Sequence, residues 1–346
     1  MATEKKLTTA QQLNFKDDFS MLRGNVNGAR LVYLDSSATS LKPQKVVDKV
    51  VEFYTEFTSN VARGDSLLSE ITTLAFEDVR SKVADYIGAN YHEIVFTMNA
   101  SDALNKIPLM LKLSQNDRVI TTLLEHHSNY LPWITRCNAT VVDLNERYDI
   151  DIDYLVKNLS SDIKLVAVTM GSNVTGNLQQ VEEIVALCRS MKIPVVVDAT
   201  QVVGHKRINV KELGCDFLVF SAHKMLGPSG VGVLYINDNI SDKLCPAFYG
   251  GGMVAKIDKE ITFKTSPFCF ETGTPAIENV LGFGAALDYL VDIGIDKIEH
   301  ILCELNDYAY EKGSRLLSFF YICQEERTNE FIEIAISMIK STLGLL

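Results

Sequence analysis

The chain contains 346 residues, of which 47% are hydrophobic and 22% are charged, and its formal net charge is −11. This length and composition predict a globular protein with two subdomains, or one large α/β domain with an appendage. The acidic balance argues against non-specific binding of nucleic acid, which requires clustered Lys and Arg. No stretch approaches the length of a membrane span and the N-terminus lacks the apolar core of a signal peptide, so we expect a cytoplasmic protein that does not contact membranes.

Short apolar runs alternate with segments of helical periodicity along most of the chain. Runs that predict strands occupy residues 93–97, 118–122, 140–144, 164–169, 194–198, 217–221 and 231–235. Helical periodicity covers residues 101–112 and 181–191, and it dominates from about Phe283 onward. Apolar strands joined by helices predict an α/β fold with a mostly parallel sheet flanked by helices. We place a large domain at residues 26–284 and a smaller one at residues 1–25 and 285–346.

A ligand site is expected at the carboxyl ends of these strands, because loops and helix N-termini converge there in parallel sheets. The segment after residues 217–221 places Lys224 among small polar residues and glycines. A surface lysine in a turn is one interpretation. The other is a nucleophilic amine that forms a Schiff base with an aldehyde cofactor, whose phosphate would bind Ser221 and His223.

Asp198 follows a run of three valines, where a carboxylate needs a cationic or hydrogen-bonded partner to offset its desolvation. A protonated pyridine nitrogen is such a partner, and Gln201 lies close enough along the chain to reach the phenolic oxygen of the same ring. The alternative role for Asp198 is an N-cap of the next helix. Asp198 and Lys224 together favour pyridoxal phosphate (PLP) as the cofactor.

Three further segments follow predicted strands. Ala100 and Ser101 begin a helix whose backbone N–H groups can cradle a phosphate, although a simple helix cap explains them as well. His126 can stack on a pyridine ring and act as an acid or base, or it is a hydrogen-bonded core histidine. Asn173 can bind the ring oxygen or the substrate, or it belongs to an ordinary turn. Each segment is a weak signal alone, and their occurrence at successive strand ends is a stronger one.

The cysteine and histidine spacings do not predict a metal site. The seven cysteines are scattered and never spaced as CxxC, which is typical of a reducing compartment rather than of a zinc site. His126 and His127 are adjacent, so they lack the helical spacing that places two ligands on one face. We therefore expect no bound metal.

With these residues in view, the chain resembles group II (SUF-type) cysteine desulfurases of the class V aminotransferase family. The matching segments are residues 33–38, 63–64, 125–133, 172–176, 197–201, 221–228, 250–253 and 270–275. The patterns EHHxNxxPW and SxHKxxGPxG within them are specific in combination. The resemblance implies a fold-type I homodimer that converts L-cysteine to L-alanine. The sulfur would leave as a persulfide for a sulfur-acceptor protein in iron–sulfur cluster or other sulfur-compound biosynthesis.

The resemblance also implies roles for individual residues. Lys224 and His126 would be catalytic, with Lys224 bonded to PLP and His126 stacked on its ring. Asp198 would pair with the pyridine nitrogen and Gln201 with the phenolic oxygen. The remaining residues would contact the cofactor phosphate (Ala100, Ser101, Ser221, His223, and Thr274 from the second chain) or the substrate (Asn173, Arg63).

The last part of the chain departs from the family pattern. Family members carry there a loop with the persulfide cysteine and an arginine that binds the substrate carboxylate. Residues 320–329 do not match this loop, so neither Cys323 nor Arg327 receives these roles and the small domain is predicted to be truncated. Two alternatives remain: another class V PLP enzyme, such as an aminotransferase or a selenocysteine lyase, and a catalytically impaired PLP-binding paralogue.

Overall fold

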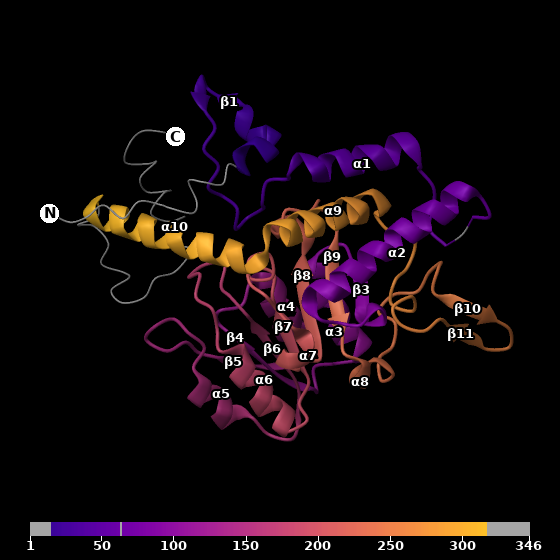
Figure 1. Cartoon of the computed structure of the whole chain (residues 1–346). Helices are drawn as coiled ribbons and strands as arrows, with labels where there is room; N and C mark the ends of the chain where they lie inside the picture. The colour runs from indigo at the N-terminus through magenta and orange to yellow at the C-terminus, as the bar shows by residue number, and fades with distance from the viewer. Residues whose placement is uncertain (1–14, 63, 317–346) are drawn as a thin grey trace.

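A computed structural model describes residues 15–62 and 64–316, and a seven-stranded sheet lies at its centre (Figure 1). The strand order is β3-β9-β8-β7-β6-β4-β5. These strands are β3 (Ile94–Thr97), β4 (Arg118–Thr122), β5 (Asn138–Val142), β6 (Ile163–Thr169), β7 (Val195–Asp198), β8 (Phe217–Ser221) and β9 (Gly232–Ile236). The mixed sheet flanked by helices confirms the predicted α/β class.

Six of these strands run in one direction and β9 runs in the other. The pairs β4–β5, β4–β6, β6–β7 and β7–β8 are parallel, whereas β9 is antiparallel to both β3 and β8. The six strands that share a direction therefore end at the same edge of the sheet. Because β9 is reversed, it begins at that edge, and the loop between β8 and β9 returns there.

Alternate side chains of each strand face two separate apolar layers. In β7, Val195 and Val197 join one core cluster and Val196 joins the other. The first layer is formed with α2 (Leu67–Ile87), α6 (Val181–Ser190) and α9 (Ile277–Ile293). The second is formed with α3 (Ala100–Met110) and α4 (His127–Arg136). Burial on both faces explains why the strands read as continuous apolar runs.

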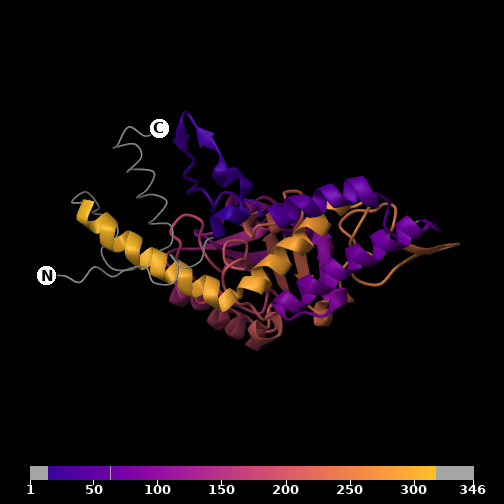
Figure 2. The ribbon, with the colours of Figure 1, turned by 45° about the horizontal axis from the view of Figure 1, so that its top comes forward.

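The remaining elements lie around this core. Helix α1 (Gln44–Glu56) packs on α9, which continues into α10 (Ile295–Leu316). Helix α10 extends from one end of the molecule and the hairpin of β10 (Val254–Ile257) and β11 (Ile261–Phe263) from the other (Figures 1 and 2). The short elements are η1 (Phe15–Asp18), η2 (Ser20–Arg23), β1 (Asn25–Val26), β2 (Ala29–Arg30), η3 (Tyr91–Glu93), α5 (Ile152–Asn158), α7 (Val210–Leu213), η4 (Ala222–Lys224) and α8 (Asp238–Ser241).

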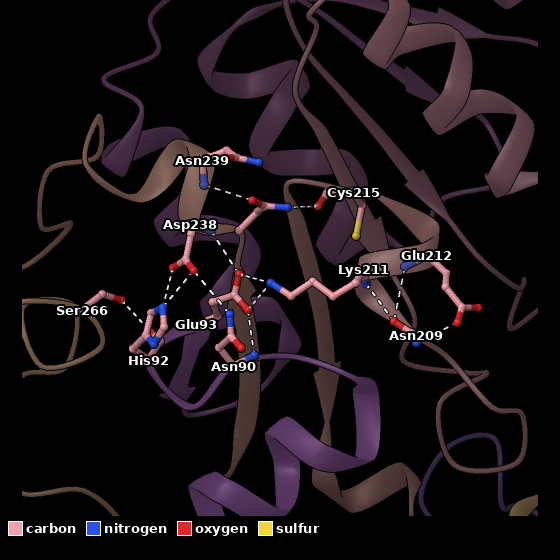
Figure 3. A network of polar contacts seen from close by, with 11 residues as sticks. Asn90, His92, Glu93, Asn209, Lys211, Glu212, Cys215, Asp238, Asn239 and Ser266 are labelled. Carbon is pink, nitrogen blue, oxygen red and sulfur yellow. Dashed lines mark hydrogen bonds and ion pairs between the residues drawn. The ribbon is translucent and has the colours of Figure 1, made fainter.

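A polar network fastens the sheet at the edge where β3 begins (Figure 3). The carboxylate of Glu93 is fully buried and accepts hydrogen bonds from Lys211 Nζ at 2.5 Å, from the backbone N–H of Asn90 at 2.7 Å and from that of Asp238 at 3.1 Å. His92 Nε2 contacts Asp238 at 2.8 Å. The network joins η3, α7 and α8 at the end of β3 opposite to Thr97.

The division into two domains stays a prediction. Helix α9 crosses the predicted boundary at residue 284 without a break, and Phe283, Ala286 and Leu287 are all buried in the first apolar layer. Residues 317–346, which the predicted small domain includes, lie outside the described part of the chain, and so do Cys323 and Arg327. Among the described residues, no helix is long and apolar enough to span a bilayer.

Candidate active site

A hollow of about 580 Å³ opens at the edge of the sheet where the six strands end. It is lined by residues at or just after the ends of β3, β4, β6, β7 and β8, by the loop that precedes β9, and by Ser37 and Ala38 before α1. Among its lining residues, Asp198 is the one carboxylate and Lys224 the one ammonium. The predicted site residues that line it are Ala100, Ser101, His126, Asn173, Asp198, Gln201, Ser221, His223 and Lys224.

Asp198 is the last residue of β7 and is 6% exposed. Burial raises the pKa of its carboxyl group, while hydrogen bonding with Thr200 and then the charges of Lys224 and His126 act in the opposite direction. Its Oδ1 accepts the backbone N–H of Thr200 at 3.0 Å. Within the described residues, Thr200 Oγ1 is buried without a hydrogen-bond partner. A buried carboxylate beside an unsatisfied hydroxyl is the local arrangement expected where a polar ligand binds.

Lys224 lies on η4, directly after β8, and a second loop braces it. The carbonyl oxygen of His223 accepts hydrogen bonds from the backbone N–H of Ser40 at 3.0 Å and from Lys42 Nζ at 3.1 Å. Ser40 Oγ also donates to this carbonyl at 2.9 Å and accepts the N–H of Leu226 at 2.8 Å. Burial lowers the pKa of Lys42 to about 8. Residues 39–42 thus fix the backbone on both sides of Lys224.

The ring of His126 has a defined tautomer. Its Nδ1 accepts the backbone N–H of Ser128 at 3.1 Å and lies 3.0 Å from Ser128 Oγ, so it caps α4. A backbone N–H can only donate, and Nδ1 must therefore be unprotonated. Partial burial and then the charge of Lys224 lower the pKa of the imidazole, which is consistent with a neutral ring. The remaining proton lies on Nε2, and His126 can donate there.

The first two residues of α3, Ala100 and Ser101, are already engaged with neighbouring elements. The backbone N–H of Ala100 donates to Ser221 Oγ at 2.8 Å, and Ser101 Oγ lies 2.6 Å from Ser128 Oγ. These contacts tie the N-terminus of α3 to the end of β8 and to α4. Ala100 was predicted to offer its N–H to a phosphate, and in this structure that N–H contacts Ser221.

Of the other predicted site residues, two line the hollow and two do not lie among its described lining residues. Gln201 lines the hollow and its Nε2 donates to the carbonyl of Ser37 at 3.3 Å, while Asn173 lines it from the turn after β6. Thr274 is exposed and is not among the residues that line the hollow of its own chain. Arg63 lies outside the described residues.

Several residues that line or support the hollow were not predicted from the sequence. Thr200 lies between Asp198 and Gln201, and its buried hydroxyl has no signal in the sequence beyond that proximity. Ser128 determines the tautomer of His126, and its place within the EHHxNxxPW pattern was the available signal. Ser40 and Lys42 contact a segment about 180 positions away in the chain, which no local pattern indicates.

The arrangement suits a planar anionic ligand with a basic ring nitrogen. Asp198 can pair with that nitrogen, Lys224 can react with a carbonyl carbon, and the hydroxyls of Ser101, Thr200 and Ser221 can face an anionic group. Among the described residues, no group of three or more His, Cys, Asp or Glu side chains is placed to hold a metal ion.

The fold and this hollow define the large α/β architecture of fold-type I PLP enzymes. The family model for class-V aminotransferases matches residues 32–343, and the chain belongs to this PLP-dependent family. It is 39% identical over 308 residues to a probable cysteine desulfurase of Halalkalibacterium halodurans, with 86% of this chain and 76% of that protein covered. It is 36% identical over 321 residues to a cysteine desulfurase of Yersinia pestis, with 90% and 79% covered.

Solved structures of similar proteins agree. An apo cysteine desulfurase from Thermococcus onnurineus superimposes with a TM-score of 0.79 at 35% identity, covering 86% of this chain and 76% of that one. The cysteine desulfurase CsdA of Escherichia coli, in an S-sulfonic acid form, gives a TM-score of 0.79 at 30% identity and covers 89% and 77%.

Proposed function

We propose that the protein is a PLP-dependent cysteine desulfurase that converts L-cysteine to L-alanine. The observation that carries this proposal is the placement of Lys224 and the buried carboxylate of Asp198 in one hollow, at the ends of neighbouring strands. The relatives named cysteine desulfurases, at 36–39% identity over most of the chain, supply the choice of substrate.

The residues of the hollow fit the cofactor. Lys224 would hold PLP covalently through Nζ, Asp198 would neutralise the ring nitrogen, and Gln201 would bind the phenolic oxygen. Ser101, Ser221 and His223 would bind the phosphate, and the unsatisfied Thr200 hydroxyl is suited to join them. When bound, PLP withdraws electrons from the α-carbon of an attached amino acid and so stabilises negative charge there.

The chain's own groups then move protons. Lys224 Nζ would remove the proton from the α-carbon of the bound cysteine, because its amine, when free, is a base within the same hollow. His126 would pack on the cofactor ring and donate from Nε2. Asn173 and Arg63 would orient the substrate carboxylate and amine.

The sulfur must be taken up by a thiol. Among the described cysteines none lines the hollow, and burial raises the pKa of Cys188 to about 12 and of Cys269 to about 11. We infer that an added thiol or an acceptor protein receives the sulfur: cysteine and R–SH become alanine and R–SSH. Iron–sulfur cluster assembly is a consumer of such persulfides, and the reducing cytoplasm suits this chemistry.

We further propose that two copies form a homodimer that completes each site. Thr274 is exposed and does not line the hollow of its own chain, so it is available to the hollow of a second copy. Apolar side chains also lie exposed at helical spacing, with Val47 and Val51 on α1 and Leu67 and Ile71 on α2. Exposed apolar faces of this kind favour association.

The test is the absorption spectrum of the PLP-loaded protein before and after addition of L-cysteine and a thiol, with alanine and persulfide assayed in the same sample. The wild type should show the band of lysine-bound PLP and release alanine and persulfide in equal amounts. Lys224→Ala should lose the band and the activity, whereas the control Lys192→Ala, at an exposed lysine outside the hollow, should keep both. A band without alanine would point to another amino acid as substrate, and no band would refute the proposal.

A further inference from the structure

Glu125 is a buried acidic residue that the proposed chemistry does not use. It is 8% exposed and immediately precedes His126 in the turn between β4 and α4. Burial raises the pKa of its carboxyl group to about 8, although its hydrogen bonds act in the opposite direction. Buried charges are retained only where specific partners hold them, so the partners of Glu125 indicate what it does.

Three donors converge on this carboxyl group. Oε1 accepts from Thr122 Oγ1 at 2.7 Å and from the backbone N–H of Thr169 at 2.9 Å, and Oε2 accepts from Asn129 Nδ2 at 2.5 Å. The Thr122 hydroxyl also accepts the N–H of Leu124 at 3.2 Å. Of the three donor groups, only this hydroxyl can also accept a hydrogen bond.

The orientation of the Asn129 amide is fixed from its other side. Trp133 is fully buried and its Nε1 donates to Asn129 Oδ1 at 3.1 Å. An indole N–H can only donate, so Oδ1 must face Trp133 and Nδ2 must face Glu125. The pattern EHHxNxxPW thus describes a chain of directed hydrogen bonds, Trp133 to Asn129 to Glu125, along one side of α4.

This chain of bonds spans the two strands that frame the hollow. Thr122 ends β4, and Thr169 ends β6, where it is the register partner of Asp198 in β7. The backbone N–H of Asn129 donates to the carbonyl of His126 at 2.8 Å. Glu125 is therefore bonded to the strand next to Asp198 on one side and to the helix that carries His126 on the other.

We propose that Glu125, with Asn129 and Trp133, is a positioning residue that holds His126 and the start of α4 in place relative to Asp198, so that the N–H of Ser128 meets His126 Nδ1 and sets its tautomer. It contacts neither cofactor nor substrate. Its role in catalysis rests on the proposed function, whereas its effect on His126 is a property of the chain itself and is measurable without any cofactor.

The test begins with the cofactor-free protein and uses ¹⁵N-labelled histidine, with the His126 resonance assigned by its loss in His126→Gln. The wild type should show the Nε2–H tautomer and a pKa below the ordinary value of 6.5. In Glu125→Gln, the new amide faces the amide of Asn129 donor to donor, and the bonds must rearrange. The His126 signal should then move toward that of an unrestrained imidazole.

A double variant provides the specific rescue. In Glu125→Gln/Asn129→Asp, the Gln amide donates to the new carboxylate, which also accepts from Trp133, so every donor again meets an acceptor and the charge is conserved. Its His126 signal should return toward that of the wild type, whereas Asn129→Asp alone, which removes the amide donor to Glu125 Oε2, should not. Thr122→Val removes one donor only and should give a smaller shift in the same direction, which keeps the test usable if a single variant folds poorly. Glu183→Gln, an exposed charge removal on α6, should change nothing.

The loaded enzyme gives a second readout. Glu125→Gln should weaken PLP binding roughly tenfold, the equivalent of about one lost buried hydrogen bond. It should also shift the cofactor band and lower kcat more than KM. The double variant should recover part of the affinity and part of kcat. An unchanged His126 signal in folded Glu125→Gln, or no rescue by the folded double variant, would overturn the proposal. If the His126 signal changes as expected but neither the wild type nor any variant binds PLP, the positioning role stands and the proposed function fails.

Discussion

The environment of Asp198 is unfavourable to the charge of its carboxylate. Its carboxylate is buried and accepts the N–H of Thr200 at 3.0 Å, and burial raises the pKa of its carboxyl group. A cationic ring nitrogen would supply the charge that offsets this desolvation. The residue therefore favours ligand binding at the expense of the stability of the empty protein.

Replacing Asp198 by Asn should separate these two effects. We expect PLP to bind roughly 100- to 4,000-fold more weakly, because breaking a buried ion pair costs about 3–5 kcal/mol. Fluorescence titration with PLP measures the dissociation constant. A variant that binds PLP as tightly as the wild type would contradict the pairing with the ring nitrogen.

The same variant should change how stability depends on pH in the cofactor-free protein. Because the folded pKa of Asp198 lies above its unfolded value, the wild type is favoured below the ordinary value of 3.8 and loses stability as the pH rises through the folded pKa. Asp198→Asn lacks this loss. Urea denaturation should therefore find the variant more stable than the wild type at pH 8, with a difference that shrinks toward pH 4.

His126 leads to a prediction for the activity of the wild type. Burial and Lys224 lower the pKa of the imidazole, so the ring stays neutral, with its proton on Nε2, to a pH below the ordinary value of 6.5. We expect kcat/KM for cysteine to hold from pH 8 down to 6.5 and to fall only below it. A fall that begins above pH 7 and persists in His126→Gln would assign the acid limb to another group.

Part of the site could be predicted from the sequence because the signal was local. Lys224 and Asp198 each follow a short apolar run, and a charged residue at the end of a buried strand stands out. Ser128 lies within a pattern that the sequence shows, whereas the buried hydroxyl of Thr200 and the partners of Glu125 depend on how the chain folds, which a sequence pattern does not specify.

At the scale of elements, helix α2 is anchored through Arg80. This guanidinium is fully buried, contacts Glu271 at 2.6 and 3.0 Å, and donates to Glu77 at 2.7 Å and to the carbonyl of Ile94 at 2.8 Å. Its charge also lies 4.7 Å from the centre of the Phe96 ring. Glu271 begins the turn that holds Thr274, so Arg80 joins α2, β3 and that turn.

Arg80→Ala should lower the free energy of unfolding by about 3–5 kcal/mol, because it leaves Glu271 without its buried partner. Urea denaturation at pH 7.5 measures the loss. Lys82→Ala is the matched control on the same helix, since Lys82 is about one-third exposed and its ion pairs with Asp78 and Asp288 should contribute less than about 1 kcal/mol. Equal losses in the two variants would contradict the anchoring role of Arg80.

The positions of the strands along the chain could be predicted from the sequence, but the direction of each strand in the sheet could not. β4 and β8 have the predicted bounds, whereas β5 lies at Asn138–Val142 instead of residues 140–144. β5 is an edge strand whose start is set by the pairing of Asn138 with Arg118, and its first residue is polar. The reversal of β9 could not be predicted, because apolar runs look alike in either direction.

At the scale of the molecule, a homodimer should have a mass of about 77 kDa, twice the 38.5 kDa of the chain. Sedimentation velocity of the wild type measures it. Leu67→Glu/Ile71→Glu places charges on the exposed apolar face of α2 and should give a monomer with lower activity. A monomeric wild type with full activity would rule out a site completed by a second chain.

Because β9 is reversed, the loop that carries Lys224 loses most of its conformational entropy when the protein folds. Ser221 and Gly232 are register partners, and the N–H of Ala222 donates to the carbonyl of Val231 at 3.0 Å, so residues 222–231 form a loop closed at its base. The entropy of closing this loop is lost when the sheet forms, before any ligand arrives. Ligand binding then restricts little more than the side-chain torsions of Lys224, and amide hydrogen exchange in this loop should be slow even in the empty protein.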